Sequence, residues 1–245
     1  YENTLRAVLG QDVFAAIEDT VSVVPEDRTS DVLDTLSQQP TMSHVQAYFA
    51  VAEAIGEHFA SSEASRSELH ACFAATDWAR PCVEQMVEAI GPRVLRRALD
   101  PEETQRLAAL YDKASAGGRE QGLSAVLSAL FQAPDFLFRL EVRGELEQDV
   151  VRLTGRELAN RLAYALWGEP PDPELVSAAD SGALDGDDGL REQAERLLAD
   201  PRARRHFGHF ASQWLLLDHV DDVENPPEYV SDGLDTTELN VAVQA

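Results

Sequence analysis

The sequence has no apolar run that approaches the roughly 20 residues needed to cross a bilayer. The longest run, at residues 214–217, stops at Asp218. A basic and apolar signal peptide is also missing from the start. Because the chain begins at Tyr1 rather than Met, we expect a processed protein or a fragment, so this absence does not argue for the cytoplasm. We therefore expect no membrane span, and the location stays open at this point.

Signatures of common enzyme classes are missing as well. The sequence contains no G-x-S-x-G, no H-E-x-x-H, no phosphate-binding G-x-x-x-x-G-K-[ST] loop and no G-x-G-x-x-G. These patterns mark serine hydrolases, zinc proteases, P-loop nucleoside triphosphatases and dinucleotide-binding enzymes. No catalytic residue can be named on this basis, and whether the protein is an enzyme stays open.

Positive charge is scarce, and lysine is almost absent. There are 20 basic residues against 44 acidic ones, a net charge of −24, and Lys113 is the single lysine. Such a surface repels phosphate backbones and anionic lipids, so we expect no nucleic-acid partner and no membrane surface. Two interpretations remain: a basic partner or bound cations, or a surface kept soluble in a salty medium with codon bias behind the arginines.

Only two cysteines occur, Cys72 and Cys82. In a continuous helix ten residues would separate them by about 15 Å, too far for a disulfide. A turn at Thr76-Asp77 would bring them together, with Asp77 as the N-cap of the following helix and Pro81 in the first turn of that helix. We favour a disulfide, with two buried thiols in a reducing compartment as the alternative.

Apolar residues recur at helical spacing along most of the chain, and alternating strand patterns are scarce. The sequence therefore predicts an all-α fold, an irregular bundle of roughly ten helices, with two packed subdomains as a variant. Strong helix starts lie at Asp100 with Glu103 and at Thr154 with Glu157, which form capping boxes. Gly91-Pro92 is expected to interrupt a helix, residues 18–30 to form a loop, and residues 141–153 a charged joint. A short helix is expected near residues 32–36.

Six segments of the chain resemble motifs of three domains. The sequences TGRELANRLAYALWG at 154–168 and LLADPRA at 197–203, followed by FASQWL at 210–215, resemble one domain of unknown function. The segment from Cys82 to Glu103 and the sequence APDFLFRLE at 133–141 resemble a companion domain. In the first of them, Ala98 replaces the proline of the domain's F-R-R-P-L motif. The start, YENTLRAVLG, is similar to the end of an N-terminal module. Such tandem helical domains occur in exported, cytochrome-c-associated proteins of planctomycetes and myxobacteria.

The resemblance predicts the domain organisation and the setting. We expect the end of an N-terminal helical module at 1–62, the companion domain at 63–141, a helical domain at 150–220, and an acidic linker or further segment at 221–245. It implies a periplasmic or extracellular location, a role in electron transfer, and haem c in flanking or partner segments. Neither Cys72 nor Cys82 begins a C-x-x-C-H haem-attachment motif, so no cofactor is expected in this chain.

Histidines and aspartates supply weak candidates for a metal site. His206 and His209 are spaced i, i+3 near the end of the patterned region, and His219 follows, so they are candidate metal or haem ligands. An ordinary helix surface is the favoured interpretation. The run at 185–189, DGDDG, resembles a calcium loop but lacks the glutamate at position 12, where Arg196 stands, so a solvated turn is favoured.

The tryptophans and one arginine pair receive structural interpretations. Trp78, Trp167 and Trp214 are predicted to be core residues whose indole N–H groups need partners. Arg96-Arg97 is a candidate for binding a carboxylate or a haem propionate, although closing the adjacent helix end is favoured.

These features give three functional hypotheses. The first is a non-catalytic helical module of an exported, c-type-cytochrome-associated redox protein, which supports haem domains or partner subunits. The second is a structural or interaction subunit of a larger assembly with no redox role. The third is part of an enzyme that acts on an extracellular polymer, its site completed by other segments. In each case the expected partners are proteins or flanking domains of the same polypeptide.

Overall fold

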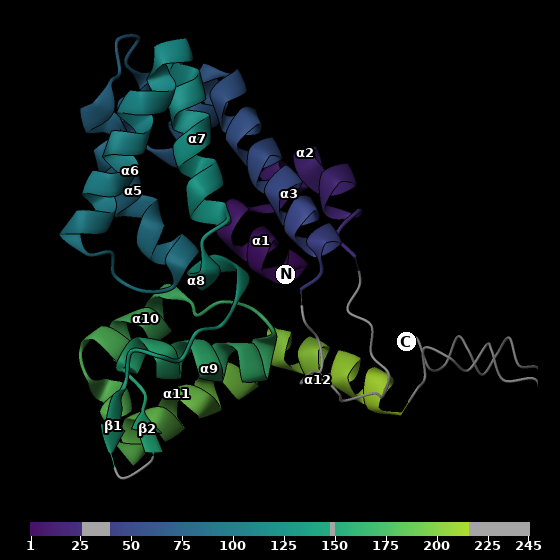
Figure 1. Ribbon diagram of the computed structural model, residues 1–245. Helices are drawn as coiled ribbons and strands as arrows, with labels where there is room; N and C mark the ends of the chain where they lie inside the picture. Colours follow the sequence, from purple (N-terminus) through teal and green to yellow (C-terminus); the bar gives the residue numbers. More distant parts are fainter. Residues whose placement is uncertain (26–39, 148–149, 216–245) are drawn as a thin grey trace, which may run out of the picture.

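The computed structural model describes residues 1–25, 40–147 and 150–215, and these residues are mostly helical. They form twelve α-helices, three short 3-10 helices and one two-stranded sheet. The helices gather into two units, one above the other in Figure 1. This confirms the all-α fold class. Within the described ranges, no helix is both long and apolar enough to cross a membrane.

The N-terminal unit contains eight α-helices and two 3-10 helices. They are α1 (Glu2–Leu9), α2 (Gln11–Val21), α3 (Met42–Ser61), α4 (Glu63–Leu69), η1 (Ala71–Ala74), α5 (Arg80–Leu95), α6 (Pro101–Ala114), η2 (Ser115–Gly117), α7 (Arg119–Phe131) and α8 (Pro134–Leu137). The second part of the chain contains β1 (Glu145–Glu147), β2 (Val150–Arg152), α9 (Gly155–Trp167), α10 (Pro173–Asp180), η3 (Ala183–Asp185), α11 (Asp187–Ala199) and α12 (Pro201–Trp214). Because α2 reaches Val21, the expected loop at 18–30 begins later than predicted.

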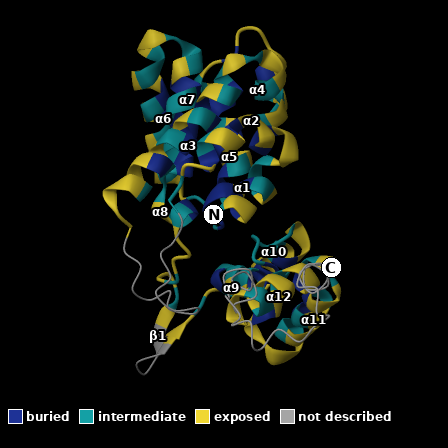
Figure 2. Ribbon diagram, turned by 90° about the vertical axis from the view of Figure 1, so that its right-hand side faces the viewer, coloured by how far each residue is buried: buried dark blue, intermediate teal, exposed yellow. Residues whose placement is uncertain are grey.

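Two separate apolar cores stabilise the two units, and the buried residues of Figure 2 lie inside each of them. In the N-terminal unit α3 packs along α7. Their close approach requires Gly56, where a Cβ atom would lie 2.7 Å from the Ser124 carbonyl oxygen. Residues from both 1–62 and 63–141 contribute to this one core, and the boundary between them stays a prediction.

Helix α5 continues through Gly91-Pro92, so the predicted interruption is wrong. Proline removes one backbone hydrogen bond in a helix, but burial of the flanking residues holds the last turn in place. Val94 and Leu95 are both buried in the N-terminal core. The helix ends at Arg96, which has a left-handed backbone conformation with φ of 54°.

The disulfide between Cys72 and Cys82 is confirmed, with their Cα atoms 5.7 Å apart. The chain turns at Thr76-Asp77 between η1 and α5, as expected. Asp77 is not the N-cap, however. That position belongs to Ala79, whose side chain cannot accept a capping hydrogen bond. Pro81 lies in the first turn of α5, and Trp78, just before the helix, packs against Phe73 with ring centroids 5.0 Å apart.

Two of the three tryptophans are core residues, and the prediction for Trp214 is wrong. Trp167 is buried and donates its indole N–H to the Leu197 carbonyl oxygen at 2.9 Å. Trp78 is also buried, but its indole nitrogen has no hydrogen-bond partner in the part of the chain that is described. Trp214 is 58% exposed. It lies on α12, where Ala203 is the one residue that the described structure buries.

In the C-terminal unit the DPRA segment organises the packing of α12 on α9. Asp200 caps α12 through the backbone N–H of Arg202 at 2.8 Å, and the Arg202 guanidinium also binds the Asp200 carboxylate. That guanidinium lies 3.4 Å from the centre of the Trp167 ring. The hydrogen bonds from Arg202 lower the pKa of Asp200 to about 2. A planar cation is well suited to such a stack.

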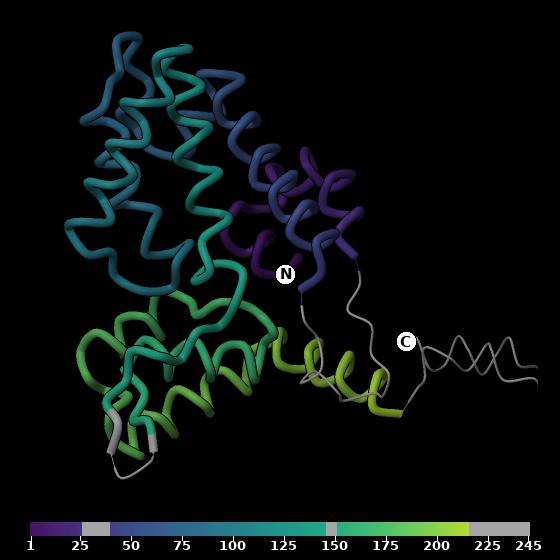
Figure 3. Tube along the Cα trace, viewed as in Figure 1, coloured from purple at the N-terminus to yellow at the C-terminus, as the bar shows by residue number. Residues whose placement is uncertain are grey.

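The charged joint between the units contains a short antiparallel hairpin that the sequence did not predict. Strands β1 and β2 pair with Leu146 opposite Val151, and Figure 3 traces the chain from α8 through this hairpin into α9. The helix expected near residues 32–36 and the segment predicted at 221–245 lie outside the described residues.

The disulfide leads to a stability prediction. Replacing both cysteines, Cys72→Ser with Cys82→Ser, is expected to lower the free energy of unfolding by about 2–3 kcal/mol, because the short closed loop restricts the unfolded chain. Urea denaturation of the two proteins measures this difference. Thiol titration of the unfolded, unreduced chain should find no free cysteine. Two free thiols there would show that the bond does not form.

Candidate binding site: an arginine-lined cleft between the two units

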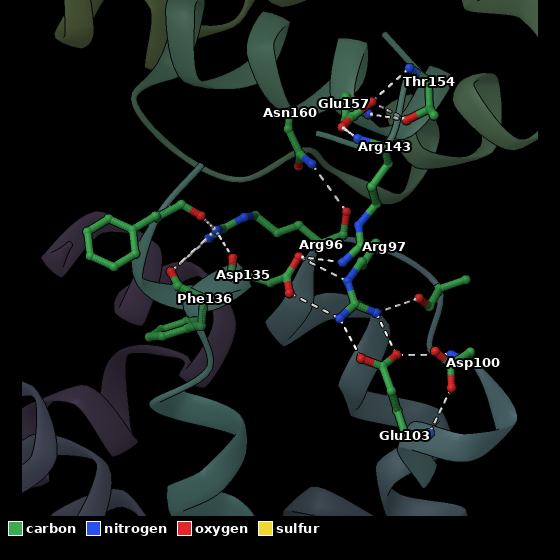
Figure 4. A network of polar contacts seen from close by, with 12 residues as sticks. Arg96, Arg97, Asp100, Glu103, Asp135, Phe136, Arg143, Thr154, Glu157 and Asn160 are labelled. Carbon is green, nitrogen blue, oxygen red and sulfur yellow. Dashed lines mark hydrogen bonds and ion pairs between the residues drawn. The ribbon is translucent and has the colours of Figure 1, made fainter. Parts of the chain in front are cut away.

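A cavity of about 380 Å³ lies where the end of α5, the α8 segment and α9 meet. Its lining is basic, although the whole chain is strongly acidic. Six arginines contribute against three carboxylates: Arg96, Arg97, Arg139, Arg143, Arg156 and Arg161 against Asp135, Glu141 and Glu157. Polar contacts around the cavity connect the two units (Figure 4).

Arg96 is the central residue of this junction and is only 7% exposed. Its guanidinium donates hydrogen bonds to the backbone carbonyls of Asp135, Phe136 and Phe138, the last at 2.9 Å. These carbonyls lie at the end of α8 and have no helical partner, so the cation stabilises a helix end. The favoured interpretation placed this role at the adjacent end of α5, whereas the Arg96 side chain closes the end of α8.

Arg97 binds two carboxylates of the chain itself, and binding of a haem propionate stays an untested prediction. Its guanidinium donates to both oxygens of Glu103, at 2.6 and 2.7 Å, and to both oxygens of Asp135, at 2.9 and 3.0 Å. Glu103 also completes the predicted capping box with Asp100. Hydrogen bonds from Arg97 lower the pKa of Glu103. Burial acts to raise the pKa of Asp135, but the bonds from Arg97 and Arg143 outweigh it and the pKa is lowered.

Side chains of α9 reach across to the N-terminal unit. The Tyr164 hydroxyl lies 2.9 Å from Thr4 Oγ1 on α1 and accepts a hydrogen bond from Arg96 at 3.2 Å. The Asn160 amide donates to the Arg96 carbonyl at 3.2 Å. The other amide atom, Asn160 Oδ1, is buried without a hydrogen-bond partner among the described residues. The two units are thus joined mainly by polar contacts to one buried arginine.

Glu157 fixes the start of α9 beside the cleft. It forms the predicted capping box with Thr154 and accepts the backbone N–H of Arg143 at 2.8 Å. Burial acts to raise the pKa of this carboxyl. Hydrogen bonds from the backbone of Thr154 and Arg143 and from the Thr154 hydroxyl outweigh burial and lower it. The chain entering α9 is therefore held by a buried, charged carboxylate.

Three arginines of the cleft keep unused donors. Arg139 is exposed, lies over the Tyr164 ring at 5.1 Å, and forms no ion pair within the described ranges. Arg143 contacts Asp135 through a single nitrogen at 3.2 Å. Arg161 pairs with Glu141 through Nε and one terminal nitrogen, which leaves its second terminal nitrogen without a hydrogen bond in the described part of the chain. These groups can bind an anion that enters from solvent.

The histidine candidates do not gather a metal site in the described part of the chain. His206 lies on α12 against Gly168, at the end of α9. Burial, followed by His209 and Arg139, lowers its pKa. No group of three possible metal-ligating side chains occurs among the described residues, and His219 lies outside them. Metal or haem ligation by His206 and His209 stays an untested prediction.

The aspartate-rich run at 185–189 is partly helical rather than a simple turn. It includes the end of η3, and α11 begins within it at Asp187. Asp187 and Asp188 therefore lie in the first turn of a helix, where negative charge is favourable.

Two family models match the chain. Residues 82–141 match PSD5, described as a protein of unknown function (DUF1595), and residues 153–243 match PSD4, described as a protein of unknown function (DUF1592). The chain carries two tandem domains of unknown function. The cleft lies where the DUF1595 domain meets the DUF1592 domain. No curated protein and no solved structure matches the chain.

Sequence reasoning missed Asn160, Tyr164 and Arg139 as members of one site. Each of them lies within a segment that carries the resemblance to these domains, 133–141 or 154–168. Those segments were the available signal. They were assigned to separate domains, and no local pattern indicates that they meet.

Removing the Arg96 side chain is expected to destabilise the protein strongly. Arg96→Ala would leave several buried carbonyls unpaired, and we expect a loss of about 2–4 kcal/mol in the free energy of unfolding. Arg96→Gly should cost less than Arg96→Ala, because glycine tolerates the positive φ. Urea denaturation measures both variants. The matched control is Arg106→Ala, whose side chain is 64% exposed. Equal effects of Arg96→Ala and Arg106→Ala would contradict a central role for Arg96.

The lowered pKa of Glu157 predicts how stability depends on pH. Its carboxylate stabilises the fold above the unfolded-state pKa of about 4.3, and this contribution is lost as pH falls through the lower folded-state pKa. Glu157→Gln should therefore cost about 1–2 kcal/mol near pH 7, and the difference from the unmodified protein should shrink below about pH 4. Urea denaturation at several pH values tests this, with exposed Glu102→Gln as control. A difference that grows at low pH would be incompatible with the assigned role.

Proposed function

We propose that this chain is a non-catalytic helical support module of an exported, c-type-cytochrome-associated redox protein. In this role its two units hold haem domains or partner subunits in a fixed relation. The haem would belong to flanking or partner segments, because neither Cys72 nor Cys82 begins a C-x-x-C-H motif.

The observation that carries this proposal is the meeting of three motif segments around Arg96. The segment at 82–103 supplies Arg96 and Arg97, and the segment at 133–141 supplies the carbonyls that Arg96 binds. The segment at 154–168 supplies Asn160 and Tyr164. Most of these polar groups bind the backbone or side chains of the chain itself. Such use favours a residue set that fixes geometry over one that performs chemistry.

The setting is supported by chemistry and by resemblance. A disulfide between Cys72 and Cys82 is compatible with an oxidising, exported location. The two matched domain families and the motifs quoted above favour the cytochrome association.

An interaction subunit with no redox role is the second candidate, and the exposed face of α12 favours it. Phe207, Phe210 and Trp214 are exposed large side chains at spacings of three and four, so they share one face of the helix. Adjacent exposed apolar side chains often mark a protein interface. This candidate differs from the first in the absence of haem.

A visible absorption spectrum of the intact native protein, isolated with its partners, separates the two candidates. We expect a Soret band that shifts on reduction with dithionite. The matched control is the 245-residue chain produced alone under conditions that support haem attachment, which should show no such band. A colourless intact protein, with no haem in its isolated assembly, would rule out the cytochrome association and leave the interaction subunit.

A further inference from the structure

The cleft between the DUF1595 and DUF1592 domains has a charge opposite to that of the whole chain. The protein carries −24, yet arginines outnumber carboxylates two to one around this cavity. A cleft with an excess of one sign of charge concentrates ligands of the other sign. Glu103 and Asp180 pair with Arg97 and Arg156 from outside the lining, and the small excess of cations that remains favours an anion.

Not all of the arginines hold the fold together. Arg96 and Arg97 are committed to carbonyls and carboxylates of the chain. Arg139, Arg143 and Arg161 are solvent-exposed, and each retains donors that the described residues do not use. The cleft thus has a fixed inner layer and an outer layer with free binding capacity.

The outer layer is also positioned in advance. The guanidinium of Arg139 lies over the Tyr164 ring, and the Tyr164 hydroxyl is held between Thr4 and Arg96. Stacking on an aromatic ring orients the planar donor face of an arginine. A side chain ordered before binding loses less entropy when a ligand arrives.

One neutral group indicates a second feature of the ligand. Asn160 lines the cavity, and its Oδ1 atom is buried with no hydrogen-bond donor among the described residues. A buried acceptor without a partner is unfavourable, and a ligand hydroxyl would satisfy it once binding turns the Asn160 side chain toward the cavity. Arginine forks, in turn, match the two oxygens of a carboxylate.

We propose that this cleft binds a small anion that carries two or more carboxylates and at least one hydroxyl group. A volume of about 380 Å³ lies in the range of small-molecule sites. Two sources offer this chemistry: a free hydroxy-polycarboxylate, or a short stretch of a uronic-acid polysaccharide. The site does not depend on the haem association proposed above.

Isothermal titration of the full chain with citrate and with digalacturonate, at constant ionic strength, tests the proposal. We expect saturable binding with one site per chain for at least one probe, and the tighter probe identifies the source. Tricarballylate, which is citrate without its hydroxyl, should bind more weakly than citrate if citrate is the tighter probe. No saturable binding of either probe would overturn the proposal, as would tighter binding of sulfate.

Variants of an exposed arginine locate the site without disturbing the fold. Arg139→Gln should weaken binding about tenfold through the loss of charge-assisted hydrogen bonds, and Arg139→Lys should fall between it and the unmodified protein. Arg106→Gln on α6 is the control and should bind normally, and circular dichroism should show the same fold for all variants. An equal loss in Arg139→Gln and Arg106→Gln would mean general charge attraction and would refute a site in the cleft.

Discussion

The packing of the two units depends on the buried guanidinium of Arg96. Removing an arginine from water is costly unless its donors are satisfied. Here the carbonyls at the end of α8 and the Tyr164 hydroxyl accept its hydrogen bonds. The same residue ends α5 with a positive φ, so backbone and side chain are fixed together. Three elements that are distant in the sequence, α5, α8 and α9, therefore share one polar centre.

A junction built this way has a structural consequence. Each unit has its own apolar core, and the contacts between them are mainly polar. Polar contacts need defined directions, so they do not fill the space between the units as a continuous apolar core would. The cavity beside Arg97 and Asp135 is the space that remains. Because charged side chains surround it, a charged ligand suits it better than an apolar one.

Local features of this fold could be predicted from the sequence, and distant ones could not. Capping boxes at Asp100 and Thr154 depend on residues three positions apart, and both form as expected. The disulfide could be predicted because its two cysteines lie ten residues apart with a turn between them. The convergence of Asn160 and Tyr164 on Arg96 spans more than 60 residues, and no local pattern reports it.

The wrong predictions have the same origin. Pro92 indicates a helix break when only the helix is considered, but tertiary burial of its neighbours keeps α5 intact. Trp214 is a large apolar residue at helical spacing from other apolar residues, which is typical of a core position. The described structure nevertheless provides no element to cover it. In both cases the outcome depended on what packs against the helix. Pattern and propensity describe the helix alone.

The preference for arginine over lysine also acquires a structural meaning at these sites. Arg97 binds four carboxylate oxygens at once, and Arg202 lies over the Trp167 ring while it pairs with Asp200. An ammonium group has neither the fork nor the plane that these contacts require. Arg96 likewise reaches several carbonyls from one buried group. A lysine at any of the three positions would keep the charge and lose the geometry, so the choice of cation follows from the way the two units are built and joined.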